Sequence, residues 1–60
     1  MALMTVKEVA AMLRLSAASI YTMAQKGQIP AIKLGGSWRF ERKTMEQFLA
    51  SRNNLNQKGN

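Results

Sequence analysis

The side chains that perform most enzyme chemistry are scarce in this sequence of 60 residues. It contains no histidine, cysteine or aspartate, and its carboxylate side chains are Glu8, Glu41 and Glu46. General acid–base catalysis uses histidine or paired carboxylates, and nucleophilic catalysis needs a base beside the nucleophile. Zinc sites use cysteine and histidine, and calcium sites use several carboxylates. The composition therefore predicts a protein that is not an enzyme and that holds no metal.

Positive charge is what the chain has in excess. Nine lysines and arginines stand against three acidic residues, which gives a net charge of +6. Such an excess in a small domain is typical of a protein that binds nucleic acid, although a solvated basic surface or an anionic membrane surface would also account for it. No apolar run approaches the roughly 20 residues that a membrane span needs. Residues 1–4 lack the features of a secretory signal, so we expect a cytoplasmic protein.

Signals for two short helices open the chain. Thr5 and Glu8 have the spacing of a capping box, and the apolar residues that follow repeat at helical spacing, which predicts a helix over residues 6–13. Ser16 is a suitable N-cap for a second helix, and Gly27 is suited to the position just after its end. The tight connection between the two predicts a helix-turn-helix.

The second predicted helix has two faces of different character. Ile20, Met23 and Ala24 form its apolar face. Its other face is free of charge and comprises Ala18, Tyr21, Thr22 and Gln25. Tyr21 could contact a partner or cover the edge of the core, and its place on the polar face favours the contact.

After Pro30 the pattern changes to an alternation of apolar and basic residues around a glycine pair, which predicts a β-hairpin. A two-residue loop would pair Ile32 with Arg39, whereas a three-residue loop would pair Lys33 with Arg39. We favour the three-residue loop because it separates apolar from basic side chains. Lys33 and Arg39 would then lie side by side on the solvent face, and Trp38 would belong to the core.

A third helix is predicted from about residue 42 to residue 52, with Met45 and Phe48 on its apolar face. The polar residues 53–60 are expected to form a disordered tail. The folded domain is accordingly predicted over residues 5–52.

In this order, the segments resemble the excisionase-family DNA-binding domain. Residues 5–13 match its T-x-x-E-x-A-x-x-L opening, and residues 26–30, 35–40 and 45–49 follow at the family's spacing. The resemblance implies a mostly α fold with a small β-hairpin, a winged helix-turn-helix in the order α-turn-α-β-β-α, related to the MerR-type domain. Members of the family include phage and mobile-element excisionases and AlpA-like bacterial regulators.

The resemblance also implies which residues meet double-stranded DNA, with the second helix in the major groove and the hairpin on the minor groove or the phosphates. They are the residues of the recognition helix, the hairpin and the cations beside them. The full set is Ser16, Ala17, Ala18, Ser19, Tyr21, Thr22, Gln25, Lys26, Lys33, Gly36, Ser37, Arg39, Arg42 and Lys43. Family members often carry Arg or Lys near positions 17, 18 and 22, where this chain has alanine, alanine and threonine. The second helix is therefore expected to offer methyl groups, hydroxyls and one amide.

Three functions stay open at this point. The resemblance implies a non-enzymatic, nucleoid-associated protein that needs no cofactor and acts as a recombination directionality factor with an integrase, associating with itself along the DNA. A small transcriptional regulator on the same fold is the second interpretation. A basic module that binds an acidic protein is the third, from another class.

Overall fold

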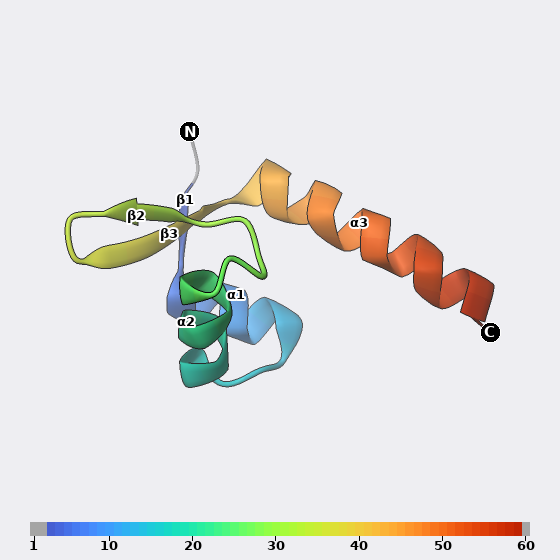
Figure 1. Ribbon diagram of the computed structural model, residues 1–60, viewed down its shortest axis with the longest axis horizontal. Helices are drawn as coiled ribbons and strands as arrows, with labels where there is room; N and C mark the ends of the chain where they lie inside the picture. The colour runs from blue at the N-terminus through green and yellow to red at the C-terminus, as the bar shows by residue number, and fades with distance from the viewer. Residues whose placement is uncertain (1–2, 60) are drawn as a thin grey trace.

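The computed structural model describes the backbone of residues 3–59 and the side chains of residues 3–52. The elements in chain order are β1 (Leu3–Thr5), α1 (Val6–Leu13), α2 (Ala17–Gln25), β2 (Ile32–Leu34), β3 (Ser37–Glu41) and α3 (Arg42–Gly59). Figure 1 shows α1 and α2 together on one side of the small sheet, while α3 leads away from them.

Side-chain caps start both short helices where the sequence predicts. In α1 the Glu8 N–H donates to Thr5 Oγ1 at 3.2 Å and the Thr5 N–H donates to Glu8 Oε1 at 2.8 Å, which confirms the capping box. In α2 the Ser19 N–H donates to Ser16 Oγ at 3.0 Å. Each cap satisfies backbone donors that a helix start leaves free, so these helices have defined first residues.

A residue in the left-handed conformation follows the last turn of each short helix. After α2 it is Gly27, at φ 71°, as predicted. After α1 it is Arg14, at φ 60° and ψ 42°, and the Leu15 N–H donates to the Ala10 carbonyl at 2.9 Å. A side chain with a Cβ pays about 1–2 kcal/mol in this conformation, which glycine adopts freely. The turn between α1 and α2 is therefore held against a local backbone preference.

A strand that the sequence analysis did not predict completes the sheet. β1 pairs antiparallel with β3, placing Met4 opposite Phe40, and the strand order is β1-β3-β2. Three residues are too few for an alternating pattern to be recognised, and β1 leads directly into the capping box of α1. The central position of β3 allows Phe40 to be fully buried. The described structure thus includes Leu3 and Met4, which precede the predicted domain start at residue 5.

The favoured hairpin register is wrong. β2 and β3 are joined by the two-residue loop of Gly35 and Gly36, so that Ile32 lies opposite Arg39 and Lys33 opposite Trp38. Because side chains alternate along a strand, Lys33 and Arg39 are on opposite faces of the sheet and not side by side.

Turn geometry explains the register. Gly35 has φ 59°, as the first position of a type II′ turn requires, and such two-residue loops match the twist of the flanking strands. The cost is the exposure of Ile32 and Leu34, at 42% and 48%. The backbone preference of the glycine pair therefore decides the hairpin register. The separation of apolar from basic side chains, on which the prediction was based, has the smaller effect.

One apolar cluster holds the elements together. All but the hairpin strand β2 contribute buried side chains, together with the segment after α2. The buried residues are Met4, Val9, Ala10, Ile20, Ala24, Ile29, Phe40 and Met45. Trp38 is half-buried and packs against this cluster, which confirms its predicted place at the core.

α3 starts at Arg42, as predicted, but its backbone stays helical to Gly59 instead of ending at Arg52. Neither proline nor glycine occurs from residue 42 to residue 58, so nothing in the sequence forces an earlier end. Disorder of the tail 53–60 in solution stays a prediction, and its side chains lie outside the described part.

The architecture is a winged helix-turn-helix: α1 and α2 form the helix pair, the β2–β3 hairpin forms the wing, and α3 follows. None of the helices described between residues 3 and 59 combines the length and the apolar character needed to cross a lipid bilayer.

Replacing Phe40 by alanine is expected to unfold most of the protein. The ring is completely buried, and truncations of this kind cost about 3–5 kcal/mol. A domain of this length has a total stability of only about 3–9 kcal/mol. Circular dichroism during urea and thermal denaturation measures the loss. Leu34→Ala, which removes a side chain that is 48% exposed, is the control and should change the stability by less than about 1 kcal/mol. Equal effects of the two substitutions would contradict the assigned core.

Arg14→Gly is expected to raise the free energy of unfolding by up to about 1 kcal/mol, because glycine adopts the left-handed conformation without a Cβ clash. Arg14→Ala removes the same charge but keeps the Cβ, so it should give no such gain. Urea denaturation of both variants separates the two effects. A stabilised alanine variant would show that charge, and not backbone strain, is the cause.

Candidate nucleic-acid interface

α2 turns one face into the core and leaves the other fully accessible. Ile20 and Ala24 are buried, which fixes the rotation of the helix about its axis. The accessible face carries the residues that the sequence analysis assigned to it, and all of them are exposed: Ala17, Ala18, Ser19, Tyr21, Thr22 and Gln25. None of these side chains is charged, as expected.

Local hydrogen bonds order the polar groups on this face. The Ser16 hydroxyl donates to Ser19 Oγ at 2.9 Å, so both hydroxyls are held at the start of α2. Gln25 Nε2 donates to the Tyr21 hydroxyl at 3.4 Å, one turn apart on the same side of the helix. The amide and the phenol thus form a paired polar group near the C-terminal end of α2.

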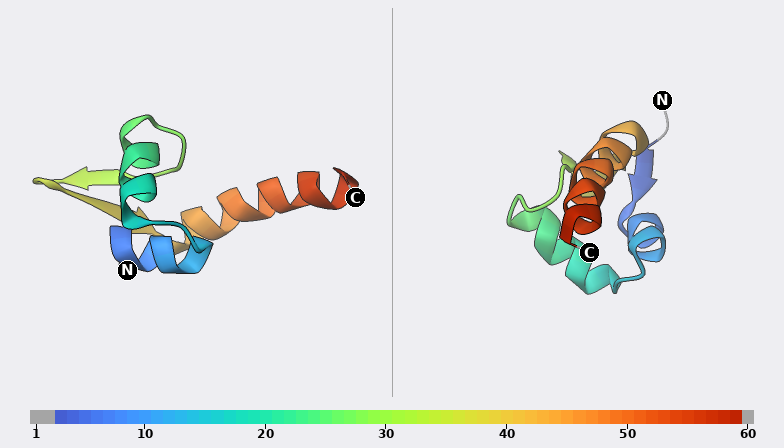
Figure 2. Two further views of the ribbon diagram at one scale, coloured as in Figure 1. Left: turned by 90° about the horizontal axis from the view of Figure 1, so that it is seen from below. Right: turned by 90° about the vertical axis from the view of Figure 1, so that its right-hand side faces the viewer.

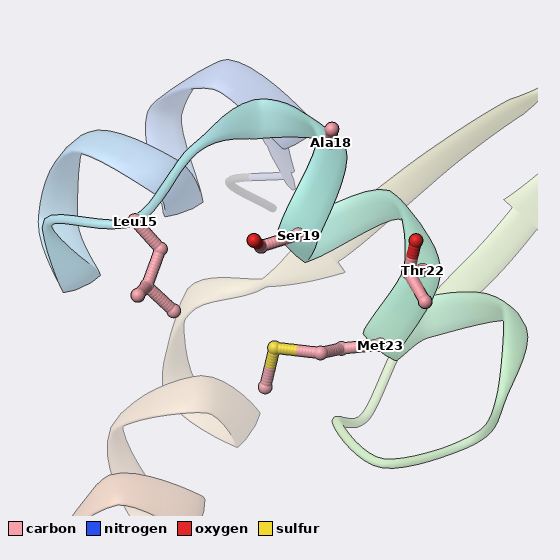
Figure 3. Close-up of a pocket in the computed structure, with 5 residues that line it drawn as sticks. All are labelled: Leu15, Ala18, Ser19, Thr22 and Met23. Carbon is pink, nitrogen blue, oxygen red and sulfur yellow. The ribbon is translucent and has the colours of Figure 1, made fainter.

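A shallow hollow of about 420 Å³ lies along one flank of α2, and we call it the methyl hollow. It is lined by Leu15, Ala18, Ser19, Thr22 and Met23. Figure 3 shows Leu15, Met23 and the Ser19 hydroxyl turned toward the same space, with Ala18 and Thr22 on the outer side of α2. Its surface is therefore formed mainly by carbon atoms of small or aliphatic side chains.

A second hollow, of about 390 Å³, lies on the other flank of α2, between the start of α1 and the wing. We call it the basic groove. Its lining residues are Thr5, Val6, Lys7, Tyr21, Gly36, Ser37, Trp38 and Arg39. It brings the cations Lys7 and Arg39 together with the hydroxyl-bearing side chains of Tyr21 and Ser37. The start of α1 also lies at this groove, where the Glu8 carboxylate already caps the positive end of the helix dipole.

Lys7 belongs to this groove although the sequence analysis did not select it. A lysine in the first turn of a helix is electrostatically unfavourable, and that signal was present in the sequence. Arg42 and Lys43, which belong to the predicted DNA-binding set, are likewise cations in the first turn of a helix, α3. Those two residues lie at the opposite end of β3 from the wing loop, so the structure does not gather them with the basic groove (Figure 1).

The wing contributes its two cations differently from the prediction. Arg39 lines the basic groove, and its Nη1 donates to the Trp38 carbonyl at 2.9 Å, which holds the guanidinium in place. Lys33 lies on the other face, with its Nζ 5.1 Å from the centroid of the Trp38 ring. This distance is within the range of a cation–π interaction. The wing therefore presents one cation to the groove and anchors the other on Trp38.

Two of the three carboxylates are occupied at helix starts. Glu8 completes the cap of α1, and Glu41 accepts a hydrogen bond from Thr44 Oγ1 at 2.7 Å at the start of α3. α2 has no acidic residue in its first turn. The exposed face of α2 is therefore free of negative side chains, and Lys26 follows directly after its last residue.

α2 stands between the two other projecting parts of the molecule. Figure 2 shows the hairpin extending to one side of α2 and α3 to the other. The basic groove is on the hairpin side, because Gly36, Ser37 and Arg39 line it. The helix therefore forms a ridge with a basic flank and an apolar flank.

Comparisons with known proteins agree with this architecture. The sequence model of a family described as a helix-turn-helix domain matches residues 3–53. Two proteins from different strains of Mycobacterium tuberculosis, each named "Putative DNA-binding protein", are 38% identical to the chain over 47 residues. The match covers 78% of this chain and 60% of each relative, so the chain spans less than two thirds of their length. No solved structure matches significantly. Because the matched residues include α1, α2 and the complete wing, the chain belongs to the helix-turn-helix domain family.

Proposed function

We propose that this protein is a non-enzymatic DNA-binding module in which α2 lies in the major groove and the basic groove contacts a phosphate beside it. The observation that carries the proposal is the juxtaposition of an exposed, uncharged helix face with a groove that holds Lys7 and Arg39. The name of the two mycobacterial relatives is in keeping with it.

The shape of α2 suits insertion into a duplex. Its nine residues span about 14 Å, and a helix with small side chains fits the major groove, which is about 12 Å wide. Ser16 caps the start of the helix and Gly27 ends it, so α2 is already formed in the free protein and does not have to become ordered on binding. A rigid helix held by its buried face can align side chains with base edges at little entropic cost.

The basic groove has the chemistry of a phosphate site. Lys7 and Arg39 supply positive charge to the groove. The Tyr21 and Ser37 hydroxyls offer further donors. Phosphate contacts of this kind fix orientation and supply affinity, whereas bases are read in the groove.

The remaining predicted contacts form part of the same proposal. Gly36 and Ser37 at the tip of the wing would approach the backbone or the adjacent minor groove. Lys26, Lys33, Arg42 and Lys43 would add long-range attraction from positions outside the basic groove.

We further propose an excisionase-type role, as the family resemblance implies. The protein would then favour excision as a recombination directionality factor with an integrase, and copies of it would associate along the DNA. A small transcriptional regulator is the alternative. In either role the proposal needs no cofactor, and the protein would act at the nucleoid.

Salt dependence tests DNA binding and its site together. The logarithm of the binding constant for a duplex should fall linearly with the logarithm of salt concentration, with a slope of about −0.9 per neutralised phosphate. Lys7→Gln and Arg39→Gln should each flatten the slope by about 0.9. Fluorescence anisotropy with a labelled duplex provides the measurement, and circular dichroism confirms that each variant is folded.

Arg52→Gln is the matched control, because it removes one charge from α3, where Arg52 lies 5.0 Å from the Phe48 ring. Its slope should stay close to that of the unchanged protein. If Lys7→Gln and Arg39→Gln leave the slope as unaltered as Arg52→Gln does, the basic groove is not part of the DNA interface. Negligible affinity for duplex at every salt concentration would favour the module that binds an acidic protein.

Footprinting separates the two proposed roles. The excisionase role predicts several adjacent protected segments that fill cooperatively as protein concentration rises, because copies associate along the DNA. A single isolated segment, filled without cooperativity, would favour the regulator.

A further inference from the structure

The exposed face of α2 lacks the side chains that most commonly read guanine. Guanine presents two acceptors to the major groove, and proteins recognise them with Arg or Lys as a bidentate donor. No arginine or lysine occurs in α2, from Ala17 to Gln25, and the first cation after it, Lys26, is beyond the last helical residue. Whatever bases this helix reads must therefore be recognised by other contacts.

The methyl hollow offers one such contact. Ala18 ends in a methyl group, Thr22 carries one beside its hydroxyl, and both are exposed at the edge of the hollow (Figure 3). Leu15, which is 46% exposed, and Met23 extend the apolar surface away from the helix axis. In the major groove of ordinary DNA only thymine presents a methyl group, at C5. An apolar surface at this point of a recognition helix is thus matched to thymine.

Gln25, at the far end of the same face, suits adenine. A glutamine side chain can pair with adenine through N6 and N7. The bond from Gln25 Nε2 to the Tyr21 hydroxyl orients the amide while leaving its oxygen able to accept. Ala18 and Gln25 are seven residues apart, about 10 Å along the helix, which corresponds to about three base steps. The Ala18 methyl and Gln25 amide contacts can therefore fall within one short site, on base pairs about three steps apart.

We infer that this helix selects A·T base pairs, and that Ala18 and Thr22 determine the specificity by contacting thymine methyl groups. The inference rests on the proposed function and adds to it the class of sequence that is bound. Affinity would come from the cations around the basic groove, and discrimination from uncharged side chains on the opposite flank of α2.

The test begins with selection of duplexes from a random pool by the full chain, followed by replacement of single thymines with deoxyuridine. Deoxyuridine differs from thymidine only by the missing C5-methyl group. At thymines facing α2 the replacement should weaken binding about fourfold, the factor that corresponds to one buried methyl group. Replacements outside the footprint should have no effect.

Matched substitutions assign the contacts. Thr22→Val keeps a methyl group and removes the hydroxyl, so it should preserve the preference for thymine over deoxyuridine. Thr22→Ser removes the methyl and keeps the hydroxyl, so the preference should disappear at one position. Ala18→Gly, in the first turn of α2, should abolish it at a different position.

Three results would overturn the inference. The first is selection of sites with G·C pairs facing α2, the second is the absence of any preferred sequence, and the third is equal affinity for thymine and deoxyuridine at every position. In each case the salt-dependent affinity and the effects of Lys7→Gln and Arg39→Gln would persist if the proposed function is right. Loss of duplex binding altogether would instead contradict the proposed function.

Discussion

The burial of Ile20 and Ala24 in the apolar cluster is the constraint from which the outer surface of this protein follows. These two side chains set the rotation of α2, and that rotation decides that Ala18, Tyr21 and Thr22 face outward. The cluster also includes Phe40, which lies at the centre of the sheet and is covered completely. The wing and the helix are thereby fixed relative to each other, and the basic groove between them exists only because both pack on the same core.

A chain of 60 residues buries a small core and has a low total stability. Several of its side-chain hydrogen bonds lie at the starts of helices. Glu8 and Glu41 act at helix starts, and Ser16 does the same for α2. This placement has an electrostatic consequence, because two of the three carboxylates serve local structure. Stability and surface charge are thus coupled in this fold: two of the acidic residues form hydrogen bonds at helix starts, and the net charge of the chain is +6.

The helical part of the fold could be predicted because its signals are local. Capping residues and glycine positions fixed both ends of α2 and the start of α1 within a few residues of sequence. The sheet could not be predicted as well, because it depends on contacts between distant segments. β1 has only three residues, and its pairing with β3 spans α1, α2 and β2. The register of the wing was missed because the backbone preference of two glycines outweighed the side-chain pattern. In the observed register Lys33 lies on the other face, and Arg39 instead lines the basic groove together with Lys7, from which it is far apart in the sequence.

Trp38 gives the molecule a property unrelated to its stability. It is the single tryptophan of the chain, it borders the basic groove, and the Lys33 ammonium lies over its ring. Indole emission responds to charge and solvent in its immediate surroundings, so an anion entering the groove would change the light that the protein itself emits. The chain consequently carries an intrinsic optical probe at the place where occupancy matters, and no dye has to be attached to either molecule.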